Sequence, residues 1–137
     1  MHISTRCRYA INALVRLALS YGGAPVQSRE IAAFGTIPPK YLEQVMHDLR
    51  QAGMVTSMRG KNGGYTLARP PEAITFAEVR ELIDGPFADD RMPVAGQADT
   101  LVEPVWRDVR HAVREVLAGA TIAATAERAR SQHMYSI

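Results

Sequence analysis

Residues 28–53 contain two helix-length segments that are separated by a turn of only three residues. The first, REIAAF, follows Ser28, a residue type that caps helix N-termini, and stops at Gly35. The second, YLEQVMHDLRQA, follows two prolines that can open a helix, and it stops at Gly53. A short helix, a tight turn and a second helix with polar residues near its start form the helix-turn-helix pattern. We therefore predict this motif in the N-terminal half of the chain.

Two short segments with β-strand composition follow, over residues 54–57 and 65–68. The basic, glycine-rich stretch MRGKNGGYTLAR, which begins at residue 58, connects them. Asn62-Gly63 predicts the hairpin turn, because both residues tolerate positive φ. A phosphate-binding loop of an enzyme is the alternative. The stretch does not match G-x-x-x-x-G-K-[ST], however, and it lies between two strands instead of between a strand and a helix.

Capping signals predict further helices before and after this hairpin. Apolar residues at helical spacing predict a helix over residues 5–20, with Ser4 or Thr5 as its cap. Thr75 to Glu78 form a capping box that opens another helix, which is expected to reach Ile83.

The C-terminal third begins with residues 86–99, where two prolines and the lack of periodicity predict a loop. A second capping box, Thr100 to Glu103, is expected to open a long helix to Leu117, and a last helix follows Thr121. The long helix carries a broad apolar stripe, which indicates contact with a second subunit. Its residues are Val102, Val105, Trp106, Val109, Val113, Val116 and Leu117.

Composition excludes several classes of protein. With 47% hydrophobic and 22% charged residues among 137, the chain matches an ordinary soluble globular protein. No apolar run is long enough to span a bilayer, and the start MHISTRCRYA lacks the apolar region of a signal peptide. The single cysteine cannot form an internal disulfide. We therefore expect a cytoplasmic protein with no membrane partner.

The charges are divided unevenly along the chain. Residues 1–65 contain eight Lys or Arg against three Asp or Glu, whereas residues 66–137 contain eight against eleven. A basic face on the N-terminal half is typical of proteins that bind polyanions.

Four stretches resemble the Rrf-two family of bacterial transcription regulators, the family of IscR, NsrR and CymR. They are RYAINALVRLA, YLEQVMHDLRQAGMVTSMRG, NGGYTLAR and VWRDVRHAVREVLAGATIA, and together they span most of the chain. The resemblance implies a mainly α fold with a small β-hairpin: a winged helix-turn-helix DNA-binding domain over residues 1–85, an effector-type loop over 86–99, and dimerisation helices and a tail over 100–137. It also implies a homodimer on double-stranded DNA, with each subunit on one half of a palindromic operator.

Within such a fold the second helix of the motif enters the major groove by its first turns, and the wing approaches the DNA backbone. Arg59 resembles the arginine that the family inserts into the minor groove, and Ser28 with Arg29 begin a helix whose amides can hold a phosphate. Glu43 and His47 equally fit a solvated helix face. The candidate DNA-binding residues are Ser28, Arg29, Pro39, Lys40, Tyr41, Glu43, Gln44, His47, Arg59, Lys61, Gly63 and Tyr65.

Many members of the family hold an iron–sulfur cluster through three cysteines in the loop that corresponds to residues 86–99. This loop contains no cysteine, so we expect no cluster, no other cofactor and no metal. Asp89, Asp90 and Asp99 could hold a divalent cation, but three aspartates also fit a solvated loop. An unidentified small-molecule effector remains open.

Cys7 is a second candidate for sensing. It lies between Arg6 and Arg8 at a helix N-terminus, where its pKa is expected to be lowered, as in a redox sensor. The alternative is a small residue that packs near the dimer interface.

The sequence thus favours a DNA-binding transcriptional regulator, in particular a repressor, over an enzyme. No nucleophile–base pair or nucleophile elbow is present to suggest catalysis. A winged-helix protein-interaction module that has lost specific DNA binding is the alternative.

Overall fold

The computed structural model describes residues 2–136, and of residues 89 and 133–136 the backbone alone. Asp89, considered above for a cation site, therefore lies outside the described side chains. The fold is mainly helical with one two-stranded antiparallel hairpin, as predicted. Its elements are α1 (Thr5–Leu19), α2 (Ser28–Gly35), α3 (Pro39–Gln51), β1 (Val55–Met58), β2 (Gly64–Leu67), η1 (Pro71–Ala73), α4 (Phe76–Asp84), η2 (Phe87–Asp90), α5 (Gln97–Gly119) and α6 (Ile122–Ser136).

Helix α1 runs through the centre of the core. Ser4 caps it as predicted, because the Ser4 hydroxyl oxygen accepts a hydrogen bond from the Cys7 amide at 3.0 Å. Its buried side chains meet those of α3, and Ile122 and Ala126 of α6 belong to the same core. Helices α2 and α4 also pack on α1. The part of the molecule from α1 to α4, with the hairpin between α3 and α4, is therefore built around one helix; we call residues 5–84 the winged part.

The helix-turn-helix forms as predicted, with one correction at its start. Ser28 is the first residue of α2 and not its cap; the cap is Gln27, whose amide donates to Glu30 Oε2 at 3.4 Å. After Gly35, Thr36 adopts the left-handed conformation with φ 52°, which turns the chain towards α3. Pro39 opens α3, as expected.

The wing is a hairpin in which Val55 pairs with Leu67 and Met58 with Gly64, so each strand is shifted by one residue from its predicted bounds. The predicted Asn62-Gly63 turn is wrong. Residues 59–63 form the loop, and the Gly63 amide donates to the Gly60 carbonyl at 3.0 Å, which places Lys61 and Asn62 at the tip. Positive φ is found instead at Gly60, inside the loop, and at Gly64, the first residue of β2.

The wing is also tied to the segment before α2. Val26 and Tyr65 exchange two backbone hydrogen bonds, each 2.9 Å long. A Cβ on Gly64 would lie 2.4 Å from the Val26 carbonyl oxygen, so only glycine fits this close approach.

Thr75 caps α4 as predicted, and its hydroxyl oxygen accepts from the Glu78 amide at 3.1 Å. The second capping box is wrong, because the cap of α5 is Gly96, four residues before Thr100, and the helix begins at Gln97. The Thr100 hydroxyl bonds the Gly96 carbonyl inside the helix instead of capping it. The last helix, α6, follows Thr121 as predicted.

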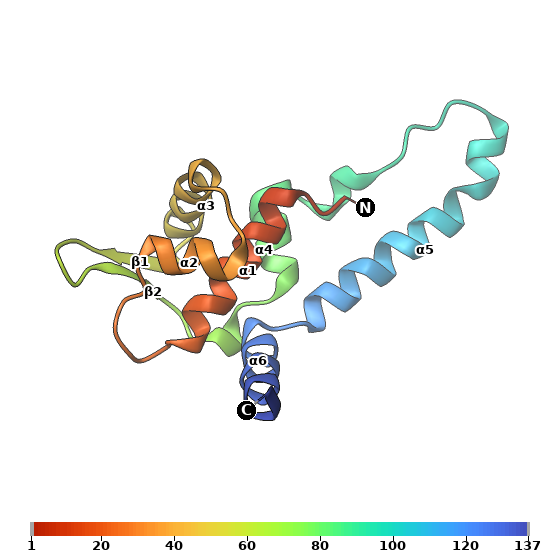
Figure 1. The fold of residues 1–137 in the computed structure, drawn as a ribbon. Coiled ribbons are helices and arrows are strands. Elements are labelled where there is room, and N and C mark those ends of the chain that lie inside the picture. The colour runs from red at the N-terminus through yellow and green to blue at the C-terminus, as the bar shows by residue number, and fades with distance from the viewer. Residues whose placement is uncertain (1, 137) are drawn as a thin grey trace.

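Figure 1 shows α5 extending away from the winged part, while α6 returns to lie beside α1. Residues Ala120 to Ile122 join α6 to the segment before α4 through backbone hydrogen bonds, including Ile122 N–H to the Ile74 carbonyl at 3.0 Å. None of the helices between residues 2 and 136 combines the length and the hydropathy that a bilayer crossing demands.

Candidate nucleic-acid interface

The first turns of α3 present polar side chains to solvent. Pro39, Lys40, Glu43, Gln44 and His47 are exposed, whereas Leu42, Val45, Met46 and Leu49 on the other face are buried in the core. This division fixes which side of α3 can meet a partner, because turning the helix would expose its apolar face.

Tyr41 is exposed, and its ring contacts two neighbouring side chains. Its ring centroid lies 5.9 Å from that of Tyr9 on α1, and the Lys40 ammonium nitrogen lies 4.9 Å from the Tyr41 ring centroid. The tilted ring contact and the cation–π contact thus orient the Tyr41 hydroxyl and the Lys40 charge at the start of α3.

The loop of the wing carries two cations, Arg59 at its start and Lys61 at its tip. Arg59 and Lys61 are exposed, while Gly63 and Tyr65 are half-buried. A Cβ on Gly63 would lie 2.2 Å from the Met58 carbonyl oxygen, so this position requires glycine to close the loop. The fixed loop therefore holds two flexible cationic side chains away from the core.

Two hollows connect the wing to the helix-turn-helix. One, about 410 Å³, is lined by residues that include Ser28, Arg29, Pro39, Glu43 and Tyr65. Because Ser28 of α2 and Tyr65 of β2 line the same hollow as residues of α3, these three elements form one surface.

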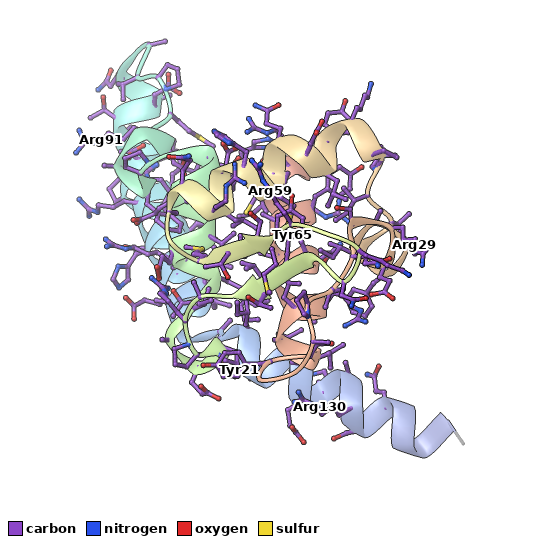
Figure 2. All side chains as sticks on the ribbon, turned by 90° about the vertical axis from the view of Figure 1, so that its left-hand side faces the viewer. Tyr21, Arg29, Arg59, Tyr65, Arg91 and Arg130 are labelled. Atoms are coloured by element: carbon purple, nitrogen blue, oxygen red, sulfur yellow. The ribbon has the colours of Figure 1, made fainter. Side chains whose placement is uncertain are left out.

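The second hollow, about 390 Å³, lies between the start of α2 and the wing. It shares Ser28 and Tyr65 with the first and adds Arg50, Arg59 and Gly63. Figure 2 shows Arg29, Arg59 and Tyr65 on the face from which the wing projects. Seven of the twelve candidate DNA-binding residues thus line the two hollows: Ser28, Arg29, Pro39, Glu43, Arg59, Gly63 and Tyr65.

Three residues of this surface with polar side chains were missed from the sequence: Gln27, Arg50 and Ser57. Arg50 lies one turn after His47 on α3, and its Nη1 donates to the Ser57 hydroxyl of β1 at 3.3 Å. The spacing of His47 and Arg50 is a usable signal, since residues three apart share a helix face. The bridge to Ser57 could not be foreseen, because it depends on how β1 leaves α3.

Cys7 differs most from expectation. The side chain is fully buried in the core, and the pKa of its thiol is raised to about 11 by burial first, with the nearby Asp84 carboxylate adding to it. The expected lowering of the Cys7 pKa is therefore wrong. Arg6 instead pairs with Asp48 of α3 at 2.8 Å. A redox role for Cys7 stays a prediction, and a buried neutral thiol does not favour it.

The residues present do not fit the iron–sulfur cluster that many members of the resembled family hold. The only cysteine is the buried Cys7, and the part of the chain that the structure describes contains no group of three His, Cys, Asp or Glu able to hold a metal. Four of the ten residues that line the cavity between residues 87–94 and α5 are arginines, which repel a cation and are not iron ligands.

Helix α5 leaves its apolar stripe uncovered. None of its residues is buried in the single chain, and Val102, Val105, Trp106, Val109 and Val116 are all exposed. Val113 and Leu117, the other two residues expected at the dimer interface, are half-buried. A contiguous apolar face on an extended helix is typical of a surface that another subunit covers.

Comparison with known proteins identifies a family and close relatives. The Rrf2 family, described as an iron-dependent transcriptional regulator, matches residues 3–128. The HTH-type transcriptional regulator CymR of Bacillus subtilis is 35% identical over 122 residues, which cover 89% of this chain and 87% of that protein. The HTH-type transcriptional regulator IscR of Aliivibrio salmonicida is 31% identical over 126 residues, which cover 89% of this chain and 75% of that protein.

Solved structures agree with these sequence matches. The structure of CymR, the global cysteine regulator of B. subtilis, has a TM-score of 0.81 and 34% identity, and the match covers 93% of this chain and 98% of that one. IscR of T. potens has a TM-score of 0.79 and 31% identity, with 98% and 96% covered.

Proposed function

Since the chain belongs to the Rrf2 family of DNA-binding transcriptional regulators, we propose that it is a sequence-specific repressor that acts as a homodimer on a palindromic operator. We place it in the cytoplasm and assign it no iron–sulfur cluster. Because the family and the named relatives are described as transcriptional regulators, we infer that the chain is not an enzyme.

The observation that carries the proposal is the single surface made by α2, α3 and the wing. Three of its cations, Arg29, Arg50 and Arg59, are separated widely in the sequence but line two adjoining hollows. Two more, Lys40 and Lys61, are exposed and directly follow the lining residues Pro39 and Gly60 in the chain. Phosphate contacts by such cations supply affinity, and side chains at the start of a recognition helix supply specificity.

We assign the roles by position. Glu43 and Gln44 on the exposed face of α3 read base edges in the major groove, and Lys40, Tyr41 and the amides at the start of α2 contact phosphates. Arg59 at the wing reaches the minor groove. The apolar stripe of α5 pairs with that of a second subunit, which gives the two-fold symmetry that a palindromic operator requires.

A gel-shift titration on the DNA upstream of the gene tests the proposal. Wild type is expected to bind this DNA far more tightly than random DNA, and binding should weaken steeply with salt because counterions are released. Arg59→Ala should weaken binding by about 1–2 kcal/mol, roughly five- to thirtyfold. Arg128→Ala on α6, an exposed arginine outside the two hollows, is the matched control and should bind as wild type does.

Equally weak binding to promoter and random DNA would refute sequence-specific repression and favour the protein-interaction module. A repressor also predicts that deleting the gene raises transcription from the bound promoter.

A further inference from the structure

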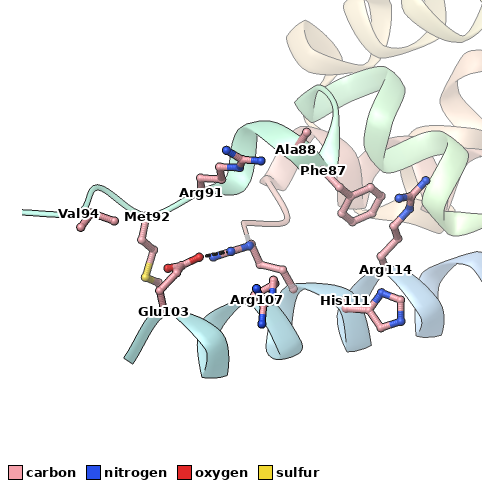
Figure 3. Close-up of a pocket in the computed structure, with 10 residues that line it drawn as sticks. Phe87, Ala88, Arg91, Met92, Val94, Glu103, Arg107, His111 and Arg114 are labelled. Carbon is pink, nitrogen blue, oxygen red and sulfur yellow. Dashed lines mark hydrogen bonds and ion pairs between the residues drawn. The ribbon is translucent and has the colours of Figure 1, made fainter. Parts of the chain in front are cut away.

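A cavity of about 500 Å³ lies outside the DNA-binding surface, between α5 and the segment of residues 87–94. Figure 3 shows Arg91 on the wall made by this segment, with Arg107, His111 and Arg114 on the opposite wall made by α5. The cavity is large enough for a small organic molecule.

The lining is strongly cationic. It contains the guanidinium groups of Arg91, Arg107, Arg110 and Arg114, and among the described side chains that line it only Glu103 is acidic. Glu103 pairs with Arg110, so the other three charges are not balanced by an acid of the lining. Like charges gathered around one cavity repel each other, and an anion in the cavity would relieve that repulsion.

Arg110 adds a second, independent observation. Its side chain is only 13% exposed, and its Nη1 is buried without a hydrogen-bond partner among the described residues. A buried donor without an acceptor costs free energy. A turn of the Arg110 side chain towards the cavity would let a carboxylate or phosphate oxygen, the acceptor that a guanidinium fits best, satisfy it.

The arginine face of α5 is distinct from its apolar stripe. At 3.6 residues per turn, Arg107, Arg110 and Arg114 are centred roughly 120° around the helix from Val102, Val109 and Val113. A second subunit that covers the apolar stripe therefore does not have to fill the cavity. Phe87, Met92 and Val94 supply apolar surface beside the arginines, against which carbon atoms of a ligand can pack.

We propose that this cavity binds a small organic anion with two or more negative charges, carried by carboxylate or phosphate groups, and that this anion is the effector of the regulator. The effector role rests on the proposed function, whereas the binding site rests on the arginines alone.

A chain of contacts leads from the cavity to the winged part. The guanidinium carbon of Arg114 lies 5.8 Å from the Phe87 ring centroid, and that of Arg80 on α4 lies 4.6 Å from the same centroid. Arg80 is buried, and it donates to the Gly85 carbonyl at 2.7 Å and to the His2 carbonyl, just before α1, at 3.2 Å. A ligand that draws Arg114 into the cavity therefore acts on the side chain that fixes α4 to the start of α1.

Isothermal titration calorimetry of the full chain at constant ionic strength tests the site, with inorganic pyrophosphate and citrate as separate arms and chloride as the reference. At least one arm should bind saturably. Arg107→Gln and Arg91→Gln, from opposite walls, should each weaken that binding by about tenfold. Both side chains are exposed, so their replacement leaves the core intact, and Arg128→Gln on α6 is the matched control.

Binding of pyrophosphate alone would assign a phosphate-bearing ligand, and binding of citrate alone a polycarboxylate. Absence of saturable binding in both arms, or equal weakening by Arg128→Gln, would overturn the site.

A gel shift at saturating anion and constant ionic strength tests the effector role. Operator affinity should change by at least about fivefold in wild type, but not in Arg107→Gln, which without anion should bind the operator as wild type does. An unchanged operator affinity would overturn the effector role. Failure of the anion-free wild type to bind any operator would instead refute the proposed function and leave the calorimetric result standing.

Discussion

At the scale of single residues, Cys7 shows how burial outweighs neighbouring charge. Arg6 and Arg8 flank it in the sequence, yet the side chain points into the core, where its thiolate would lose hydration. Arg6 is engaged with Asp48. The Asp84 carboxylate disfavours the Cys7 thiolate further, and the Arg80 guanidinium offsets only part of this effect.

This burial makes Cys7 slow to react in the folded protein. We expect iodoacetamide at neutral pH to modify Cys7 only as fast as the protein opens, because the reactive thiolate is both scarce and inaccessible. Mass spectrometry with and without denaturant measures the difference. Rapid modification of the folded protein would contradict the burial.

The raised pKa also fixes a pH dependence. The unfolded thiol ionises near its ordinary value of 9.0 and the folded thiol at about 11, so its contribution to stability is complete below pH 9 and is lost as pH rises towards 11. Complete loss of this contribution lowers the free energy of unfolding by about 2–3 kcal/mol. Urea unfolding at about pH 8 and about pH 10.5 should show a smaller drop for Cys7→Ala than for wild type; equal drops would exclude Cys7 as the cause.

Gly64 is the residue on which the position of the wing depends. Its φ of 151° and the 2.4 Å approach that a Cβ would make to the Val26 carbonyl oxygen both oppose any other residue. We expect Gly64→Ala to cost about 1–3 kcal/mol and to weaken operator binding, since the wing must shift.

Gly96→Ala is the matched control for this substitution. Gly96 has an extended backbone, and a Cβ there would meet no atom within 4 Å. Thermal unfolding and gel shifts of the two variants should differ clearly. Similar behaviour of both would show that the wing tolerates a side chain at position 64.

At the scale of elements, α5 is the helix that packs least against the rest of the chain. It contacts α4 and η2, while its apolar stripe faces away from the chain's own core. A helix of 23 residues in this situation depends on another surface for much of its stability.

Val109→Glu on α5 is therefore expected to dissociate the proposed homodimer, because a carboxylate at the centre of an apolar interface is costly to bury. Light scattering should show a monomer, and operator affinity should fall by at least about tenfold because the two half-sites are then bound independently. Asp108→Ala, next to Val109 but on another face of the helix, should remain dimeric. A dimeric Val109→Glu would place the interface elsewhere.

At the scale of the whole molecule, the hydrophobic core of the winged part is not formed by the N-terminal residues alone. Ile122 and Ala126 of α6 are buried against the core around α1, and Phe76 N–H donates to the Ala120 carbonyl at 2.9 Å. The division into a DNA-binding domain of residues 1–85, a loop of 86–99 and a C-terminal part stays a proposal. We add to it that α6 completes the core from the far end of the chain.

Ile122→Ala tests this closure. Removing a fully buried isoleucine side chain should lower the free energy of unfolding by about 2–4 kcal/mol and should weaken operator binding only through the loss of folded protein. Glu127→Ala on the exposed face of α6 should change stability by less than about 0.5 kcal/mol. Chemical denaturation measures both, and a small effect of Ile122→Ala would show that α6 packs only loosely.

The sequence by itself determined the elements and the family. Capping by Ser4 and Thr75, the stops at Gly35 and Gly53, and the apolar stripe of α5 are local signals, because a helix end is satisfied by residues within one turn of it. Local signals failed to identify the N-cap where two nearby residues could both take that position. Gln27 and not Ser28 caps α2, and Gly96 and not Thr100 caps α5.

Only the tertiary structure decided which distant residues share a surface. The burial of Cys7 beside Asp84, the bridge of Arg50 to Ser57, the closure of the core by Ile122 and the cavity of arginines all depend on how separate elements pack. Periodicity shows that a helix has an apolar or a charged face. Which element packs against that face depends on the three-dimensional fold of the chain. For this reason the DNA-binding elements could be predicted from the sequence, whereas the hollows that join them and the anion site could not.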